Sequence, residues 1–310
     1  MSNQLSVPFG GRPYEYAVVD VFSERALQGN MLAVFSDGRG LSDAEMQALA
    51  RETNLAETTF IIPRDVATER ERGVRVRIFT VKEELEFAGH PTLGTASWLW
   101  WNHAEFAGGE EFALELRIGK IPVRFTRPAA GEAGVFAEMR QRDPEFGSVH
   151  SKTAVAAALD LREEDLSPDL PVQTVSTGMA FCIVPLASME VAKRLQSSWA
   201  KVGPYLATTD AKFFYCITPA EKNSGADWHA RMQFYNGEDP ATGSACGCAI
   251  SYLVRHDAVK SEQKIFIEQG IEVLRPSRLR AHAKLLDSKV TDVHVGGRTI
   301  PVASGRFFLP

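Results

Sequence analysis

Cysteine is scarce in this chain of 310 residues, and the four present, at positions 182, 216, 246 and 248, are scattered. So few cysteines do not indicate a disulfide framework, and they fit a reducing cytoplasm. Cys246 and Cys248 form a Cys-x-Cys pair, but no second ligand pair follows at a zinc-like spacing. We therefore interpret both as small buried residues and expect no metal site.

Long apolar runs and blocks of one charge are also missing. The most apolar stretch, Leu93–Trp101, is far too short to span a bilayer. The first ten residues have neither the basic start nor the apolar core of a signal peptide. The 34 Lys and Arg residues stand against 39 Asp and Glu, with no basic patch among aromatic residues. We expect a cytoplasmic protein that binds a small molecule, with no membrane or nucleic-acid partner.

The chain has the composition of a globular protein, with 45% apolar and 24% charged residues, and its length favours two domains. A capping box at Ser42–Glu45 predicts a helix that runs to about Glu52. Two more helices are expected at Ser151–Leu159 and Ser188–Leu195. Short apolar, β-branched segments outnumber the helices and alternate with them irregularly, which predicts an α+β fold. The expected strands include Tyr16–Phe22, Leu32–Phe35, Thr58–Ile62, Val74–Phe79, Ala113–Ile118, Ile121–Thr126, Phe181–Pro185, Phe213–Thr218, Ala230–Tyr235 and Lys264–Glu268.

An internal repeat is the most informative pattern. The segment His90-Pro91-Thr92-Leu93-Gly94-Thr95-Ala96 is similar to Asp239-Pro240-Ala241-Thr242-Gly243-Ser244-Ala245, at an offset of 149 residues. Each copy predicts a strand, a Pro- and Gly-containing turn and an apolar helix, at Gly94–Trp101 and Gly243–Val254. Two similar halves would face each other across a cleft, joined by the Pro-, Gly- and Ala-rich linker Arg127–Gly134.

The two turns are candidate binding sites for an anion. Helix N-termini carry unpaired N–H groups and a partial positive charge, so turns at Gly89 and Gly243 suit a carboxylate or a developing enolate. The hydroxyls of Thr95, Thr242 and Ser244 would add donors. Either turn alone is better interpreted as an ordinary N-cap, and the repetition favours the binding role. Neither turn has the pattern of a P-loop or of a dinucleotide-binding fingerprint.

Glu57 is the leading candidate for a general base. It lies at the start of an apolar strand, where partial desolvation would raise its pKa towards the working pH. The similar segment Ser176–Pro185 offers no carboxylate, so the base would come from one half only. His90 and Asp239, the polar residues of the two turns, would add a second acid or base or orient the substrate. The alternatives are a capping histidine and an Asx-turn.

At this point the motifs resemble those of the PhzF-like family, the phenazine-biosynthesis isomerases related to diaminopimelate epimerase. The similarity extends from about Val18 to the C-terminus, over nearly the whole chain. The segments that carry it are Asp20-Val21-Phe22, Gly29-Asn30, Asn54–Phe60, Arg77–Thr80, Glu84–Ala96, Glu238–Ala245, Glu268-Gln269-Gly270 and Arg275-Pro276-Ser277.

The resemblance implies two pseudo-symmetric lobes, each a β-barrel-like sheet around a central helix. Residues 1–128 with about 296–310 would form the N-terminal lobe, and residues 129–295 the C-terminal lobe. A homodimer is common in the family, and neither a metal nor a cofactor takes part. The family's active-site Glu, His, Asp and Ser map onto Glu57, His90, Asp239 and Ser244. Related epimerases use one cysteine at each turn, and this chain has none there.

We therefore expect a cofactor-free isomerase that moves a proton on a small unsaturated or amino-bearing carboxylic acid, resembling trans-2,3-dihydro-3-hydroxyanthranilate isomerase. One alternative is an epimerase or racemase acting at a carbon next to a carboxylate, which needs a second base. The other is a carboxylate-binding protein without catalytic activity.

Overall fold

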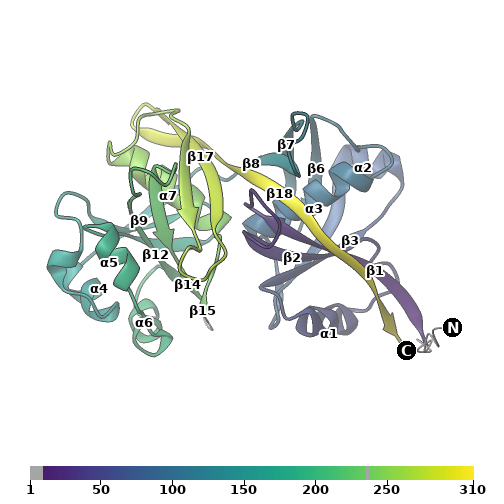
Figure 1. Cartoon of the computed structure of the whole chain (residues 1–310), viewed down its shortest axis with the longest axis horizontal. Coiled ribbons are helices and arrows are strands. Elements are labelled where there is room, and N and C mark those ends of the chain that lie inside the picture. Colours follow the sequence, from purple (N-terminus) through teal and green to yellow (C-terminus); the bar gives the residue numbers. More distant parts are fainter. Residues whose placement is uncertain (1–9, 235–236) are drawn as a thin grey trace.

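The computed structural model describes residues 10–234 and 237–310. Two lobes lie side by side, and each wraps a sheet around one long helix (Figure 1). The expected α+β fold with two barrel-like lobes is therefore confirmed. Tyr235, the last residue of one expected strand, lies outside the described residues.

The first half of the chain builds most of one lobe, and its elements follow in this order: β1 (Arg12–Val21), β2 (Asn30–Phe35), α1 (Asp43–Thr53), β3 (Glu57–Ile62), α2 (Val66–Arg72), β4 (Val74–Phe79), β5 (Glu84–Leu85), α3 (Gly89–Asn102), β6 (Glu111–Leu116), β7 (Gly119–Thr126) and β8 (Val135–Arg140).

The second half continues with β9 (Glu145–His150), α4 (Lys152–Ala158), the 3₁₀ turn Glu163–Asp165, β10 (Val172–Ser176), β11 (Ala180–Pro185), α5 (Met189–Arg194), α6 (Trp199–Leu206), β12 (Phe213–Pro219), β13 (Trp228–Arg231), β14 (Gln233–Phe234), β15 (Gly237–Glu238), α7 (Gly243–Arg255), β16 (Ile265–Gln269), β17 (Ser277–Leu286) and β18 (Lys289–Leu309).

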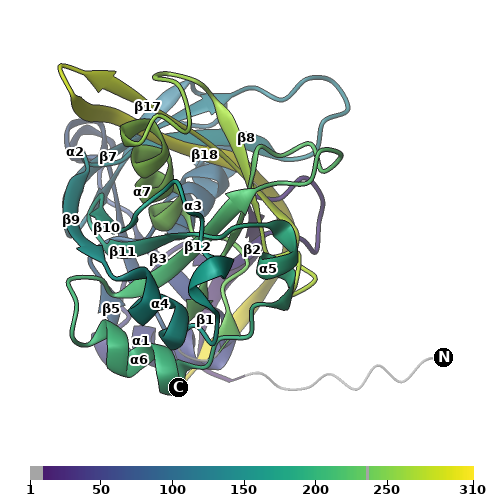
Figure 2. The same ribbon diagram turned by 90° about the vertical axis from the view of Figure 1, so that its left-hand side faces the viewer.

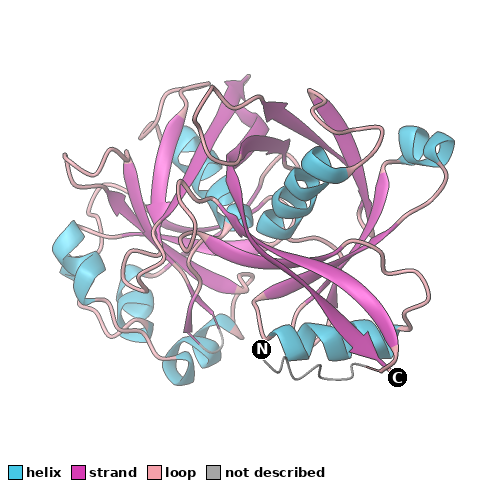
Figure 3. Ribbon diagram, turned by 45° about the vertical axis from the view of Figure 1, so that its right-hand side comes forward, coloured by secondary structure: helices cyan, strands magenta, loops and turns pink. Residues whose placement is uncertain are grey.

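The first sheet closes on itself because the last strand of the chain returns to it. In the order β1-β2-β3-β4-β6-β7-β8-β18, strand β18 also pairs with β1. Closure leaves no free edge in this barrel. Helix α3 lies inside it (Figure 3). Residues Gly89–Ala96 of this helix are all buried.

Strand β18 belongs to both sheets. Its first part pairs with β17, its middle with β8 and its last part with β1. From β17 the second sheet continues through β16, β13, β12, β11 and β10 to β9, around helix α7 (Figure 2). The division into residues 1–128 with 296–310 and 129–295 stays a proposal, because β18 is shared and β8, inside the proposed second lobe, pairs with β7 of the first.

Helix starts explain where the sequence prediction succeeded and where it erred. Ser42 and Glu45 form the expected capping box of α1. The second central helix begins at Gly243 as expected. The first begins at Gly89 and not at Gly94, so His90-Pro91 is its first turn rather than a loop before it. Proline is compatible with that position because the first helical N–H groups have no intrahelical acceptor.

The repeat is present in the structure, but its register differs from the expected one. The pairing β2∥β3, β4, β6, β7 recurs as β11∥β12, β13, β16, β17. Both central helices begin at a glycine, Gly89 and Gly243, which are 154 residues apart and not 149. His90 is therefore equivalent to Ser244, while Asp239 lies in the loop before α7.

This register also changes which residue of the second lobe is equivalent to Glu57. Strand β11, which contains most of the segment Ser176–Pro185, is equivalent to β2 and not to β3. Phe60 faces Arg77 and Cys216 faces Arg231 in equivalent pairings. Three residues earlier in each strand, Glu57 is therefore equivalent to Phe213.

Within residues 10–234 and 237–310, no helix is long and apolar enough to cross a membrane.

Candidate active site

The N-termini of the two central helices meet between the lobes. Neither α3 nor α7 has a side-chain cap, so their first N–H groups face the junction without one. A Cβ atom placed on Gly89 would lie 3.0 Å from the Ser244 nitrogen and 3.2 Å from the Gly243 carbonyl carbon. The close approach requires glycine at position 89, and it aligns the positive ends of two helix dipoles on one point.

A small cavity of about 70 Å³ lies at this junction, and a wider cleft of about 480 Å³ adjoins it. Glu57, Thr80, Phe234 and Asp239 line both. Its lining also includes six apolar side chains: Leu85, Met179, Phe181, Phe213, Met232 and Phe234.

Local structure brings Glu57 to the mouth of the cavity. Helix α1 ends at Thr53, and the left-handed conformation of its C-cap Asn54 (φ 51°) stops the helix shortly before the strand. Strand β3 then begins at Glu57, parallel to β2, so Asn30 and Glu57 start neighbouring strands at the same end of the sheet.

Glu57 and His90 face each other in the cavity. Glu57 Oε2 lies 3.4 Å from His90 Nε2. Both atoms are buried, and neither has a hydrogen-bond partner within the described residues. Burial raises the pKa of the Glu57 carboxyl to about 8, and the charge of Asp239 adds to the rise. Burial lowers the pKa of the His90 imidazole to about 3, so this ring is neutral at pH 7.

Asp239 is held opposite by donors from both lobes. Asn30 Nδ2 donates to Asp239 Oδ1 at 2.8 Å and to the Ala241 carbonyl at 2.9 Å, and it also lies 3.3 Å from His90 Nδ1. Thr242 donates to Asp239 Oδ2 at 2.6 Å. Burial raises the pKa of Asp239 to about 6, while the bonds from Thr242 and Asn30 lower it. The two carboxyls thus titrate on either side of pH 7.

Gln269 fixes the loop behind Asp239. Its amide nitrogen donates to the Asp239 carbonyl at 2.7 Å and to the Thr242 hydroxyl at 2.9 Å. Its oxygen accepts from the Thr242 N–H at 3.1 Å and from the Tyr215 hydroxyl at 3.0 Å. All four contacts are satisfied, so this turn is rigid.

The structure brings most of the predicted site residues together. Glu57, Gly89, His90, Asp239, Thr242, Gly243 and Ser244 all line the cavity. Thr95 does not: it lies one and a half turns into α3, and its hydroxyl is 2.8 Å from that of Thr59 inside the first barrel. Its expected role in binding is therefore corrected to a role in packing.

Three residues at or behind the site were missed from the sequence. Asn30 and Gln269 occur in motifs that we had noted, but their partners lie far away in the chain. Lys212, next to the equivalent of Glu57, lines the cavity from the second lobe, with its ammonium nitrogen 5.7 Å from the Phe213 ring. A lysine before an apolar strand gives no indication in the sequence that it lines a cavity.

Two bidentate Arg–Glu pairs occupy equivalent positions in the two lobes. In the first lobe, Arg77 donates to both oxygens of Glu84, at 2.8 and 2.7 Å. In the second, Arg231 donates in the same way to Glu238, the residue before Asp239. Both pairs span seven residues and share the offset of 154. Each therefore fixes a short strand pair at the rim of the cleft.

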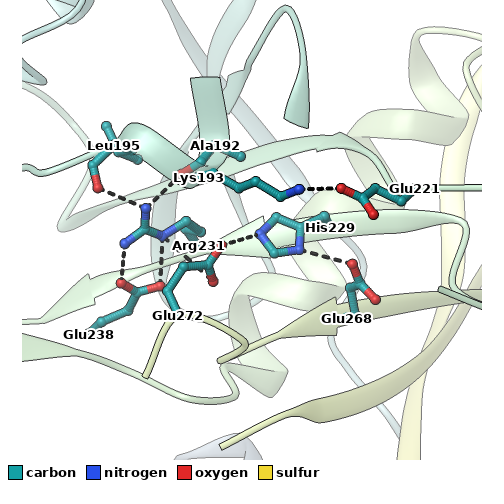
Figure 4. A network of polar contacts seen from close by, with 9 residues as sticks. All are labelled: Ala192, Lys193, Leu195, Glu221, His229, Arg231, Glu238, Glu268 and Glu272. Carbon is teal, nitrogen blue, oxygen red and sulfur yellow. Dashed lines mark hydrogen bonds and ion pairs between the residues drawn. The ribbon is translucent and has the colours of Figure 1, made fainter. Parts of the chain in front are cut away.

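Arg231 also belongs to a network of charged side chains behind the loop that precedes α7 (Figure 4). The His229 imidazole lies between two carboxylates, with Nδ1 3.1 Å from Glu268 and Nε2 3.0 Å from Glu272. Burial opposes the charge on His229, but these two partners raise its pKa to about 9. The imidazolium is therefore present at pH 7, and it holds the segments around Gln269 and Asp239 together.

The Asn30→Ala variant is expected to lower turnover by about 100-fold, because Asp239 loses a donor and its position shifts. The lost hydrogen bond also moves the pKa of Asp239 above about 6, since this bond now lowers it. The pH dependence of kcat/KM measures both effects. Asn102→Ala, on an exposed residue at the end of α3, is the matched control. A kcat/KM equal to that of the wild type would contradict the role of Asn30.

Comparison with known proteins agrees with this geometry. The family model described as phenazine biosynthesis-like protein matches residues 19–305. The trans-2,3-dihydro-3-hydroxyanthranilate isomerase of Pseudomonas aeruginosa is 35% identical over 96% of this chain and 100% of its own. An uncharacterized isomerase of Mesorhizobium japonicum is 34% identical over 95% and 98%. The solved structure of a predicted epimerase from P. aeruginosa has a TM-score of 0.80 at 33% identity, over 96% and 100%.

The fold and these relatives define an isomerase with two lobes of the epimerase-like type. The chain belongs to the PhzC–PhzF family of phenazine biosynthesis-like proteins.

Proposed function

We propose that this protein isomerises a small unsaturated or amino-bearing carboxylic acid by moving a proton between carbon atoms, with Glu57 as the proton carrier. The observation that carries the proposal is the facing pair of buried, unpartnered atoms, Glu57 Oε2 and His90 Nε2. Buried polar atoms without partners are rare in native proteins, and a bound substrate would satisfy both.

The rest of the cavity suits such a substrate. The uncapped N-termini of α3 and α7 offer N–H groups to a carboxylate or to the charge that develops when the proton leaves. Ser244 and Lys212 would add a hydroxyl and a cation. The apolar side chains that line the cavity would pack against a planar unsaturated ring. An acid similar to trans-2,3-dihydro-3-hydroxyanthranilate, the substrate in the name of one relative, is therefore our first choice.

One base favours isomerisation over racemisation. A two-base racemase needs an acid or base on each face of the carbon, and the equivalent of Glu57 is Phe213. Cys246 is buried, and burial keeps its pKa far above neutral. Asp239 remains the candidate second base for the alternative epimerase. A homodimer and a cytoplasmic location stay predictions.

Exchange in D₂O distinguishes the candidate functions. Unsaturated cyclic amino acids, including trans-2,3-dihydro-3-hydroxyanthranilate, are incubated with the protein and followed by ¹H NMR. An isomerase gives a shifted double bond, with label on one face of one carbon. A racemase labels both enantiomers, and a binding protein broadens the ligand signals without exchange. Either of the last two results would contradict the proposal.

The rate should depend on pH through Glu57. A base that takes a proton from carbon must begin as the carboxylate, so kcat/KM rises about tenfold per pH unit and levels above its pKa of about 8. Asp239→Asn removes the negative charge that raises this pKa, and the rising limb should move to lower pH. A rate that is constant between pH 6 and 9 would exclude Glu57 as the starting base.

A further inference from the structure

Three side chains of types that can bind metals lie close together on the outer face of the sheet where β8, β18 and β17 are neighbours, away from the catalytic cavity. Glu138 comes from β8, His282 from β17 and His294 from β18, and their ligand atoms all lie within 4.8 Å of one another. His282 is directly opposite His294 in the β17–β18 pairing, and Glu138 is opposite Gly296 on the other side of β18. The three therefore share one face.

Their distances are close to those of a coordination site. Glu138 Oε1 is 3.6 Å from His294 Nδ1, and Glu138 Oε2 is 3.9 Å from His282 Nδ1. Ligand atoms at about 2.0–2.1 Å from a tetrahedral zinc ion would be about 3.3–3.4 Å apart. The two Glu138–histidine distances exceed this value by a few tenths of an ångström, and the two histidine nitrogens, which lie within 4.8 Å of each other, must approach as well. His282 Nδ1 is buried and has no hydrogen-bond partner among the described residues.

A second carboxylate orients His294 for this role. Asp292 Oδ1 lies 3.1 Å from His294 Nε2, so Nε2 carries the proton, and Nδ1, 3.6 Å from Glu138 Oε1, keeps the lone pair that a metal ion would need. Metal-bound histidines commonly donate their other N–H to a carboxylate in this way. A surface hollow of about 300 Å³, lined by Glu138, Asp292 and His294, gives access from solvent.

Two features must change when a metal enters. The imidazole rings are nearly parallel, at 5° with centroids 4.8 Å apart, so at least one must turn to point its lone pair at a common centre. Arg280 donates to Glu138 Oε2 at 3.3 Å and would release it. Arg280 also lies on the Phe136 ring, 3.8 Å from its centroid, and this contact can retain the guanidinium.

We propose that Glu138, His282 and His294 bind a divalent first-row transition metal, with water in the remaining position. Two imidazoles and a carboxylate are ligands that Zn²⁺ accepts. The site lies where β18 passes between β17 and β8, so the metal would join three strands at the place where the lobes share their sheet. It shares no lining residue with the catalytic cavity. Its role is structural.

Zinc titration of the full chain tests the site. Protein treated with a chelator and then dialysed is titrated with Zn²⁺ against a chromophoric competitor, and one ion per chain is expected. His282→Ala and His294→Ala should each lower the affinity at least tenfold. Asp292→Asn should lower it about 10- to 100-fold by loosening His294. Zn²⁺ should raise the Tm of the wild type and leave that of the two histidine variants unchanged.

Matched controls separate the site from surface binding. His256→Ala removes a half-buried histidine of the same lobe that is bound to Gln173, and it should leave the affinity unchanged. If an alanine variant fails to fold, Glu138→Gln, which keeps the side-chain volume, tests the site in its place. The proposal is overturned if the wild type binds no stoichiometric Zn²⁺. It is equally overturned if His256→Ala weakens binding as much as His282→Ala does.

Discussion

The Glu57→Gln variant is expected to lose at least 100-fold, and up to about 10⁴-fold, in the rate of proton transfer, because an amide cannot accept the proton. The same change should make the protein more stable. Both effects follow from the burial of Glu57 Oε2 without a partner.

The stability gain depends on pH in a defined direction. The pKa of Glu57 is raised from 4.5 to about 8 on folding. Below pH 4.5 the group is therefore protonated in both the folded and the unfolded state, and its ionisation does not lower the free energy of unfolding. Above pH 4.5 the unfolded chain ionises while the folded protein keeps its proton, and stability falls until about pH 8. At about 1.36 kcal/mol per unit, the difference is about 3 kcal/mol at pH 7.

Urea unfolding of the wild type and of Glu57→Gln at pH 4.5 and pH 7 measures this difference. The two proteins should be similar at the lower pH and diverge at the higher. Glu52→Gln, on an exposed residue of α1, should change neither the exchange rate nor the pH dependence. Equal stabilities at pH 7 would mean that Glu57 is ionised in the folded protein and is therefore a weaker base than proposed.

The Asp20→Ala variant is expected to lose about 3–5 kcal/mol in the free energy of unfolding. Asp20 is 1% exposed, binds Arg275 at 2.7 Å across the lobes and accepts from the Leu27 N–H at 2.6 Å. Arg275 also donates to the carbonyls of Gln28 and Gly29. Removing the carboxylate leaves the partly buried Arg275 guanidinium without its counter-ion and releases the turn that places Asn30.

Much of this loss should come from the unpaired arginine rather than from the missing attraction. Burial raises the pKa of Asp20 although Arg275 lowers it, so the pair does not fully offset its own desolvation. The double variant Asp20→Ala/Arg275→Met should therefore recover part of the stability. Asp37→Ala, at an exposed pair with Arg39, is the control and should change little. If the double variant is no more stable than Asp20→Ala, the loss of stability comes from the released turn alone.

Local signals carried the sequence prediction of the fold. The capping box of α1 and the short apolar strands are encoded within a few residues of each other. The start of α3 is not encoded locally in this way, because a proline in the first turn of a helix and a proline in the preceding loop look the same in sequence. The repeat offset of 149 matched turn residues that happen to be similar. The Arg77–Glu84 and Arg231–Glu238 pairs give the true offset.

The site was predicted in part for the same reason. Glu57, His90 and Asp239 stand in motifs, and the structure brings them to one cavity. Asn30 and Asp239 are 209 residues apart, so their hydrogen bond appears only after the lobes dock. Thr95 was misplaced because the helix begins five residues earlier than expected, which turns its hydroxyl towards Thr59.

The shared strand β18 sets how the chain can be divided. A fragment that ends at the linker Arg127–Gly134 contains β1–β7 but not the strand that closes their barrel, so β1 would keep a bare edge. The remaining piece would carry Ile300–Leu309 without a partner. Neither half is therefore a free-standing module, and the two should melt in one transition. Mixed as separate polypeptides, they would complement each other through β18, as the parts of a split enzyme do.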